Sequence, residues 1–242
     1  MLITSKSNPI IKAVSALSDK KFRKQQGLYI VEGIKPVNEC IGAGCQIDRI
    51  ICVEGLEDSF AGATVVTESV FKSISSEKTP QGVIAVVKIP QFQLKPPEKP
   101  CLLLDCLQDP GNLGTVIRTA NASGYEDIYM INCTDPYSPK AVRASMSGIF
   151  FVNVYQGTRE DVLGALEGVP IVCADMCGED IFAFNPPKKY CLCVGNEGSG
   201  ISSEIKERAS YTVKIPMRST CESLNVAVSA GIAMYALRKN KY

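Results

Sequence analysis

The sequence predicts an α/β protein: a C-terminal, mainly parallel sheet with helices on both faces, preceded by a small N-terminal α/β sandwich. Short apolar runs alternate with helical patterns along the 242 residues, and this alternation is typical of parallel sheets. The later runs are continuously apolar, as in strands that are buried on both faces. The proline-rich stretch IPQFQLKPPEKP separates the two parts. We therefore predict domains at 1–90 and 101–242, joined by a linker at 91–100.

The N-terminal part begins with a helix signal. Asn8 is a suitable N-cap, Pro9 suits the first helical position, and apolar residues follow at helical spacing. Strands are expected at Leu28–Val31, Ile47–Val53, Ala63–Val66 and Val83–Val87, and helices at Val37–Ala43 and Ser69–Ile74.

The C-terminal part repeats the strand–helix alternation at larger scale, without an internal repeat. Strands are expected at Cys101–Asp105, Asp127–Ile131, Phe150–Tyr155, Pro170–Ala174, Tyr190–Gly195 and Tyr211–Ile215. Helices are expected at Leu113–Ser123, Pro139–Ser145, Asp161–Leu166, Ser203–Arg208 and Ser223–Arg238.

The composition excludes several classes of site. The chain has no histidine, which rules out His-containing zinc sites, Ser-His-Asp catalysis and an imidazole base. The eleven cysteines show no metal-binding spacing. We interpret them as small buried residues in a reducing compartment, with a disulfide or a Cys-only metal site as the alternative.

No apolar run approaches the roughly 20 residues that span a bilayer, and the N-terminus lacks a signal-peptide core. We therefore expect a cytoplasmic protein without membrane association.

Basic residues cluster near the N-terminus, although the net charge is only +1. The first 24 residues contain six Lys or Arg and one acid, Asp19. Such a local patch could contact nucleic acid or could simply be a solvated helix face.

The segment from Leu102 to Gly124 predicts a strand, a Pro-Gly turn and a helix that starts at Asn112. The free N–H groups at this helix start, near Asn112 and Gly114, could hold a phosphate or an oxyanion. Arg118 could grip such a group in bidentate fashion, although an arginine in this position is more often structural.

The segment CLCVGNEGSGIS, residues 191–202, predicts a strand, a glycine-rich turn and a helix start. Its spacing is neither that of a P-loop nor that of a dinucleotide fingerprint, which excludes a Rossmann dehydrogenase. The glycines allow the backbone to approach a flat ligand closely, and Glu197 adds a carboxylate. Taken alone, the turn could be structural or ligand-binding.

A third segment, residues 213–237, predicts a strand, a polar loop and a long helix. Its apolar residues fit an ordinary core, whereas Asn225 could cap the helix, bond a loop or touch a ligand.

Together, NLGTVIRTA, VGNEGSGIS and IPMRSTCESLNVAVSAGIAMY resemble, in order and spacing, the three motifs of the SpoU/TrmH RNA ribose methyltransferases of the SPOUT superfamily. SPKAVRASMSGIF resembles the segment between the first two motifs. The N-terminal stretch and QGVIAVV resemble the RNA substrate-binding domain of many members, so the resemblance covers nearly the whole chain.

The resemblance implies a C-terminal trefoil knot, which the periodicity of the sequence would not reveal because knots are rare. It implies an S-adenosyl-L-methionine cofactor, a homodimer with the active site near the interface, and no metal. Cofactor contacts are expected from Gly195, Asn196, Glu197, Ile215, Met217 and Leu224. Catalytic roles are expected for Arg118, Asn112, Ser223, Asn225 and Glu197. Candidate RNA contacts are Lys12, Lys20, Lys21, Arg23 and Arg143.

The implied reaction is methyl transfer to a ribose 2′-hydroxyl of structured RNA, with 23S ribosomal RNA as the preferred substrate. Arginine stays protonated, so we expect Arg118 to bind the adjacent phosphate and stabilise the developing alkoxide instead of acting as the base. Transfer RNA as substrate, or a non-catalytic RNA-binding protein on the same fold, are the alternatives.

Overall fold

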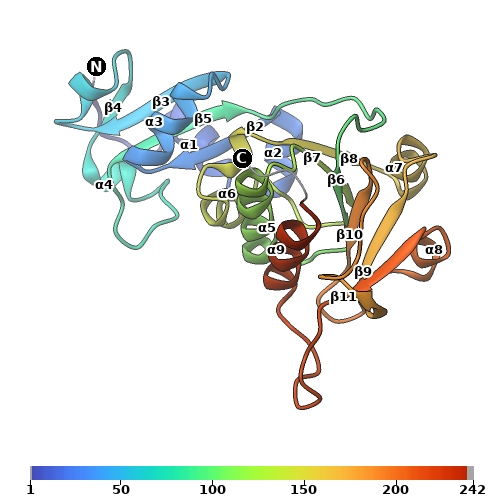
Figure 1. The fold of residues 1–242 in the computed structure, drawn as a ribbon. Helices are drawn as coiled ribbons and strands as arrows, with labels where there is room; N and C mark the ends of the chain where they lie inside the picture. The colour runs from blue at the N-terminus through green and yellow to red at the C-terminus, as the bar shows by residue number, and fades with distance from the viewer. Residues whose placement is uncertain (1, 239–242) are drawn as a thin grey trace. The chain divides into compact units, whose positions relative to one another are not determined.

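The computed structural model describes residues 2–238, which form two compact units (Figure 1). The N-terminal unit holds 2–90 and 135–150, and the C-terminal unit holds 91–134 and 151–238. The segment 135–150 therefore leaves the C-terminal chain and packs with the N-terminal residues. None of the helices in the described range is long and apolar enough to cross a membrane.

The N-terminal unit is built on a mixed five-stranded sheet in the order β1-β4-β3-β5-β2. The first three strands in this order are parallel, and β5 runs antiparallel to both of its neighbours. The strands are β1 Leu2–Ile3, β2 Leu28–Glu32, β3 Ile47–Val53, β4 Thr64–Val66 and β5 Val83–Lys88. The helices are α1 Pro9–Ala16, α2 Lys20–Gln26, α3 Ile34–Gly42, α4 Glu68–Phe71 and α6 Pro139–Ala144, with 3-10 turns at Glu57–Ser59 and Gly148–Phe150.

Helix α1 starts as its sequence predicts. Asn8 accepts a hydrogen bond from the backbone N–H of Ile10 at 2.9 Å, and Pro9 occupies the first turn. Ile11 and Val14 then point into the apolar core beneath the sheet.

Helix α2 contains a buried cation. Arg23 is only 3% exposed, and its guanidinium donates to Asp135 at 2.7 and 2.9 Å. It also donates to the carbonyls of Leu17 and Ser18 at 2.7 and 2.8 Å. The Arg23–Asp135 pair thus ties the segment 135–150 to the N-terminal helices.

The C-terminal unit is built on a six-stranded sheet in the order β11-β9-β10-β6-β7-β8. All five pairings are parallel, so the expected mainly parallel sheet is confirmed. The strands are β6 Cys101–Asp105, β7 Asp127–Ile131, β8 Asn153–Gly157, β9 Ile171–Asp180, β10 Cys191–Val194 and β11 Tyr211–Lys214. The helices are α5 Pro110–Ser123, α7 Arg159–Ala165, α8 Ser203–Glu207 and α9 Val226–Leu237.

The central strands β6 and β10 are neighbours although about 90 residues separate them along the chain. From β6 the chain proceeds to β7 and β8 on one side, and β9 and β11 lie beyond β10 on the other. The carboxyl ends of β6 and β10 therefore form a topological switch point, where parallel α/β sheets bind ligands.

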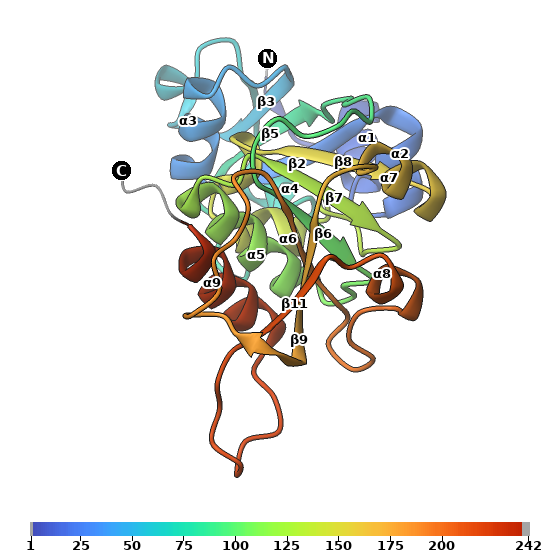
Figure 2. The same cartoon turned by 45° about the vertical axis from the view of Figure 1, so that its right-hand side comes forward.

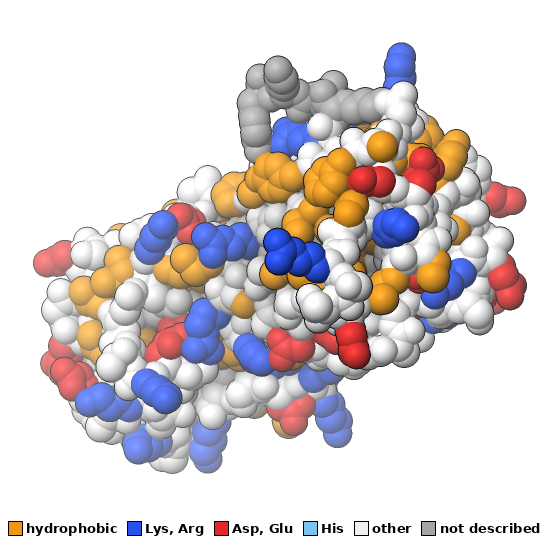
Figure 3. Space-filling view, turned by 60° about the horizontal axis from the view of Figure 1, so that its bottom comes forward, with side chains coloured by type: hydrophobic (Ala, Val, Ile, Leu, Met, Phe, Trp, Pro, Cys, Tyr) orange, Lys and Arg blue, Asp and Glu red, His pale blue; other side chains and the backbone are white. Residues whose placement is uncertain are grey.

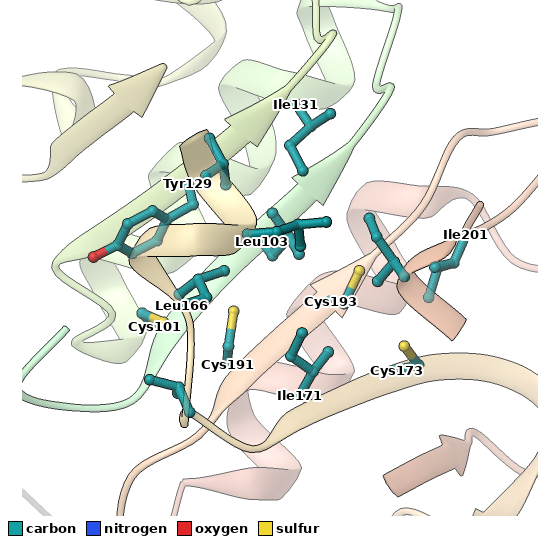
Figure 4. Close-up of a cluster of buried hydrophobic side chains, with 14 of the residues drawn as sticks. Cys101, Leu103, Tyr129, Ile131, Leu166, Ile171, Cys173, Cys191, Cys193 and Ile201 are labelled. Carbon is teal, nitrogen blue, oxygen red and sulfur yellow. The ribbon is translucent and has the colours of Figure 1, made fainter. Parts of the chain in front are cut away.

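Cysteines fill part of the core on one face of this sheet. Cys191 lies opposite Cys101 and Cys193 lies opposite Cys173 in the strand register, and all four are buried (Figure 4). Cys191 and Cys193, two residues apart on β10, therefore lie on the same side of that strand. All eleven cysteines are free thiols.

Two elements begin three residues later than the sequence predicts. The strand expected from Phe150 starts at Asn153, because a 3-10 turn occupies Gly148–Phe150. The helix expected from Ser223 starts at Val226, because the Asn225 side chain caps it by accepting from the N–H groups of the next turn.

The C-terminal helix returns to the middle of the unit. The chain leaves β11 at the sheet edge, and α9 then packs on α5, the helix that follows the central strand β6 (Figure 2). This crossing brings residues after β11 beside residues after β6, and it is here that the resemblance places the knot.

We predict that Arg23→Ala lowers the free energy of unfolding by about 3 kcal/mol, because it leaves the Asp135 carboxylate without its buried partner. Urea denaturation measures the change. Lys24→Ala, at the exposed neighbouring position, is the control and should be close to neutral. An unchanged midpoint for Arg23→Ala would show that the pair does not stabilise the unit.

Candidate active site

A buried carboxylate organises the switch point. Asp105, at the end of β6, is 1% exposed and accepts from the Arg159 guanidinium at 3.1 Å and from the Ser202 N–H at 2.8 Å. Arg159 also donates to the Ser202 hydroxyl at 2.6 Å. These bonds fix the end of the glycine-rich loop against the end of β6.

The glycine-rich loop folds back on itself. Asn196 and Gly200 exchange two backbone hydrogen bonds of 2.9 and 3.0 Å, and the Asn196 amide donates to the Cys106 carbonyl at 2.7 Å. A Cβ on Gly195 would lie 2.3 Å from the backbone of Gly200 and Ile201. The close approach of the loop's own backbone therefore requires glycine at position 195, whether or not the loop binds a ligand.

The start of helix α5 differs from its expected form. Asp109 is the N-cap and Pro110 the first residue, so the helix begins before Asn112. The Asn112 N–H donates to the Asp109 carboxylate at 2.8 Å. The expectation of a free N–H at Asn112 for a phosphate is therefore wrong, since a carboxylate of the same turn uses it.

Glu197 bonds to the same turn from the other side. Its carboxylate accepts from the N–H groups of Gln108 at 3.3 Å and Asp109 at 3.2 Å. The N–H groups of this turn therefore bind a carboxylate of the glycine-rich loop.

A chain of side-chain hydrogen bonds joins the three segments. The Asn112 amide donates to Glu197 at 3.2 Å, and the Asn225 amide donates to the Asn112 side-chain oxygen at 3.0 Å. Each of the three residues comes from a different one of the segments that the sequence singled out. The structure therefore brings Asn112, Glu197 and Asn225 together.

The pKa of Glu197 is lowered. Burial acts to raise it, but hydrogen bonds to the carboxylate, from its own backbone, the Asn112 amide and the N–H groups of Asp109 and Gln108, outweigh that effect. The carboxylate is therefore ionised at neutral pH, as an acceptor of several donors should be.

Arg118 projects from helix α5 into solvent. Within residues 2–238 it has neither an ion-pair nor a hydrogen-bond partner. An exposed, unpaired guanidinium on the helix that starts at the switch point is free to bind an anionic ligand.

A cavity of about 120 Å³ lies beside the third segment. Its lining contains four of the expected site residues, Ile215, Met217, Ser223 and Leu224. Gly195, Asn196 and Glu197 do not line it. The expected cofactor residues thus fall into two groups, one around this cavity and one in the glycine-rich loop.

The walls of the cavity are mostly apolar, and the adjoining backbone offers unpaired hydrogen-bonding groups. Among the described residues, the backbone groups of Met217 and Leu224 have no hydrogen-bond partner. Such groups can pair with the polar edge of a flat ligand whose faces contact the apolar walls.

The cavity also has lining residues that the sequence reasoning missed. Ala174, Asp175 and Met176 lie in the middle of β9, just after the residues that pair with β10. The Lys206 ammonium contacts the Asp175 carboxylate at 2.7 Å and lowers its pKa. The position of Asp175, just after an apolar run, was the signal available, because residues at the carboxyl ends of parallel strands line ligand sites.

The candidate RNA contacts differ in exposure. Lys12, Lys20 and Lys21 are exposed on α1 and α2. Figure 3 shows Lys and Arg side chains interspersed with Asp and Glu on the face drawn there. Arg143 is half exposed and pairs with Glu77 at 2.9 Å. The prediction for Arg23 is wrong, because its guanidinium is buried and its donors are engaged within the protein.

Comparison with known proteins agrees with this architecture. A model of the SpoU rRNA Methylase family matches residues 99–235, and a model of the MRM3-like substrate binding domain matches residues 8–85. The chain is 30% identical over 245 residues to the 23S rRNA (guanosine(2553)-2′-O)-methyltransferase RlmP of Bacillus subtilis, covering 98% of each chain. It is 31% identical over 260 residues to an uncharacterised tRNA/rRNA methyltransferase of Synechocystis, covering 99% of this chain and 94% of the relative.

The fold also matches a solved structure, that of an AdoMet-bound rRNA methyltransferase from Sinorhizobium meliloti. The TM-score is 0.89 at 30% identity, with 98% of this chain and 96% of that one covered. The chain therefore belongs to the SpoU rRNA methylase family. It is an RNA 2′-O-methyltransferase with a SPOUT-type C-terminal unit.

We predict that the stabilising effect of the Glu197 carboxylate is lost in acid. Its folded-state pKa lies below the ordinary value of about 4.3, so the contribution is present above that value and disappears as the pH falls through the folded-state pKa. Glu197→Gln should therefore lower the melting temperature at about pH 7 and have less effect near pH 4. Thermal unfolding of both proteins across this range measures it. A difference that does not shrink on acidification would contradict the role of the charge.

Proposed function

We propose that this protein transfers a methyl group from S-adenosylmethionine to a ribose 2′-hydroxyl of 23S ribosomal RNA in the cytoplasm. The observation that carries the proposal is the hydrogen-bonded chain Glu197–Asn112–Asn225, which assembles three distant segments near the exposed Arg118. The relative from Bacillus subtilis is named for this reaction on 23S rRNA, which supports the choice of substrate.

The residues around the 120 Å³ cavity suit part of the cofactor. Apolar side chains such as Ile215 and Leu224 can contact the faces of an adenine ring, and unpaired backbone groups can bond its edge. The cavity is smaller than the roughly 300–1,000 Å³ of typical ligand sites. The rest of the cofactor would therefore lie outside it, toward the glycine-rich loop in our assignment.

S-adenosylmethionine, when bound, supplies an electrophilic methyl group on a positively charged sulfur. The ribose oxygen becomes a good nucleophile as its proton leaves, and the new O–CH3 bond forms while the S–CH3 bond breaks. We assign Arg118 to the phosphate beside that ribose. The phosphate accepts the proton, and the guanidinium stabilises the negative charge that develops on the oxygen. The charge already present on the sulfur makes a metal ion unnecessary.

Asn112, Asn225 and Glu197 act by holding the site together. Their side chains bond to one another and to backbone groups, so they fix the turn before α5 relative to the start of α9. Positioning of this kind is where much of the rate of a two-substrate reaction originates. Ser223 lies at the cavity wall, where it can contact either substrate.

The protein acts as a homodimer in this proposal. Helix α9 is apolar on its outward side as well as its inward side, with Val228 and Tyr235 both 51% exposed. These residues and Ile232 between them follow helical spacing, so they form one stripe. An exposed apolar stripe of this kind is suited to a second copy of the chain.

Mapping of ribose methylations tests the proposed reaction and its substrate. The 23S rRNA from cells lacking the gene should miss one 2′-O-methyl group, and the purified protein with S-adenosylmethionine should restore it. If transfer RNA alone lacks a methyl group in these cells, then transfer RNA is the substrate and 23S rRNA is not. The absence of any missing methyl group, together with no binding of S-adenosylmethionine by calorimetry, would favour a non-catalytic RNA-binding protein.

We predict that Arg118→Ala reduces methyl transfer by about 100-fold or more, because one stabiliser of the transition-state charge is lost. The affinity for S-adenosylmethionine, measured by calorimetry, should stay nearly the same. Arg118→Lys keeps the charge without the bidentate fork and should retain intermediate activity. Turnover retained in Arg118→Ala would remove Arg118 from the mechanism.

We predict that Val228→Asp converts the dimer to a monomer, because it buries an unpaired carboxylate in the proposed interface. Analytical ultracentrifugation measures the mass, and methyl transfer should fall with it. Ile41→Asp, at an exposed apolar position on α3, is the matched control and should stay dimeric. A Val228→Asp protein that remains dimeric would place the interface elsewhere.

A further inference from the structure

The N-terminal unit contains a second cavity, of about 400 Å³, to which the three segments of the candidate active site contribute nothing. One side is formed by β2 and the start of α3, and the other by α6 and the turn after it. Its volume lies within the roughly 300–1,000 Å³ of sites for small organic ligands.

The walls of this cavity include several apolar side chains. Val31 comes from β2, and Val142 and Phe150 come from the segment 135–150. Apolar surfaces that face one another across a narrow space suit a flat, ring-shaped group.

A polar group in the wall has no partner. The Ser147 side chain is 94% buried, being 6% exposed, and its hydroxyl forms no hydrogen bond with the described residues. A buried hydroxyl without a partner costs free energy, and few native groups are left in this state. The hydroxyl is therefore available to a ligand in the cavity.

The backbone at the same place is strained. Met146 and Ser147 have φ values of +44° and +68°, a region that side-chain-bearing residues rarely adopt. Backbone strain of this kind concentrates at ligand-binding sites, where the surrounding structure holds it in place. Two such residues in succession, beside the unpartnered hydroxyl, therefore point to the same cavity.

A cation lies at the rim. Arg143 lines the cavity, is about half exposed, and donates to the carboxylate of Glu77 and the hydroxyl of Ser76. An arginine in this position can bind a phosphate that enters with the ligand.

We propose that this cavity binds one unstacked base of the RNA substrate. The proposal rests on the proposed function, since it takes RNA to be the substrate. Proteins read RNA sequence mainly by stacking splayed-out bases on side chains and bonding their edges. Here the apolar walls contact the ring, the Ser147 hydroxyl bonds the base edge, and Arg143 contacts the backbone phosphate.

The position of the cavity favours a base over other flat ligands. Most of its wall lies in the part of the chain that matches a substrate-binding domain, residues 8–85. The exposed lysines of α1 and α2 belong to the same unit, and basic residues of this kind attract a phosphate backbone.

The first test is Ser147→Ala in the full-length protein. It removes an unpartnered hydroxyl, so the melting temperature should stay the same or rise. If the hydroxyl bonds a base, the affinity for RNA should nonetheless fall about 3- to 10-fold, the loss of one hydrogen bond. The probe is a mixture of ribosomal and transfer RNA, and binding is measured by filter retention at fixed salt.

Ser145→Ala is the matched control. Ser145 is buried on the same segment, but its hydroxyl donates to the Val142 carbonyl at 2.7 Å and it does not line the cavity. This variant should melt at a lower temperature and bind RNA like the wild type. The two serines therefore give opposite patterns of stability and affinity.

The second test blocks the cavity. Thr79 is exposed at its edge, so Thr79→Trp adds bulk at the mouth without disturbing the core. This variant should also weaken RNA binding. In dimethyl sulfate probing of bound 23S rRNA, one base that the wild type protects should become reactive.

The proposal is overturned if Ser147→Ala and Thr79→Trp both bind RNA like the wild type, or if Ser147→Ala lowers the melting temperature as Ser145→Ala does. Unchanged RNA affinity would assign the cavity to a ligand other than RNA. If the wild type itself neither binds nor methylates RNA, the proposed function fails, and the base-binding proposal fails with it.

Discussion

The carboxylate of Asp105 is the constraint on which the site depends. Asp105 is the last residue of β6, a strand whose residues are all buried. A buried carboxylate is tolerated there because it accepts hydrogen bonds from Arg159 and from the Ser202 N–H. These partners come from the elements that follow β8 and β10. One carboxylate therefore connects the carboxyl end of β6 to the residues that follow β8 and β10, and it fixes the end of the glycine-rich loop.

The polar residues around this carboxylate divide into two kinds. Asn196, Glu197, Asn112 and Asn225 are largely engaged with one another and with backbone groups, so they form a fixed frame. Arg118 stands outside that frame with no protein partner among the described residues. A fixed frame of this kind, together with the available Arg118 guanidinium, suits a reaction in which negative charge develops on the substrate. The protein groups can then stabilise that charge without rearranging.

Much of the fold could be predicted from local sequence. The strands Cys101–Asp105 and Asp127–Ile131 match their predicted bounds, because a continuous apolar run bounded by polar residues marks both ends of a buried strand. Helix starts were less reliable, because Asp109 and Asn225 cap through side-chain bonds that compete with other candidate caps nearby. No local sequence pattern indicates that α9 crosses back onto α5. Only the family resemblance, through the knot that it implies, predicted such a crossing.

The errors at the site arise where a protein partner, distant or local, occupies a group that the sequence left open. Arg23 stands in a basic run and its sequence neighbours are exposed, yet Asp135, 112 residues away, makes it structural. The Asn112 N–H, expected to be free, donates to the Asp109 carboxylate of the same turn. Glu197, 88 and 89 residues further along the chain, accepts from the N–H groups of Asp109 and Gln108. Sequence identifies which groups can pair, but the partner decides whether a group remains free for a substrate.

The hydrogen-bonded chain Glu197–Asn112–Asn225 also has a consequence for biosynthesis. Its first member to be translated is Asn112 and its last is Asn225, and α9 must then pack on α5 to hold that last link. A nascent chain folds from its N-terminal side as it emerges, so the N-terminal residues can fold long before the catalytic frame closes. The frame that joins Asn112 to Asn225 can therefore close only after α9 has been synthesised and can pack on α5.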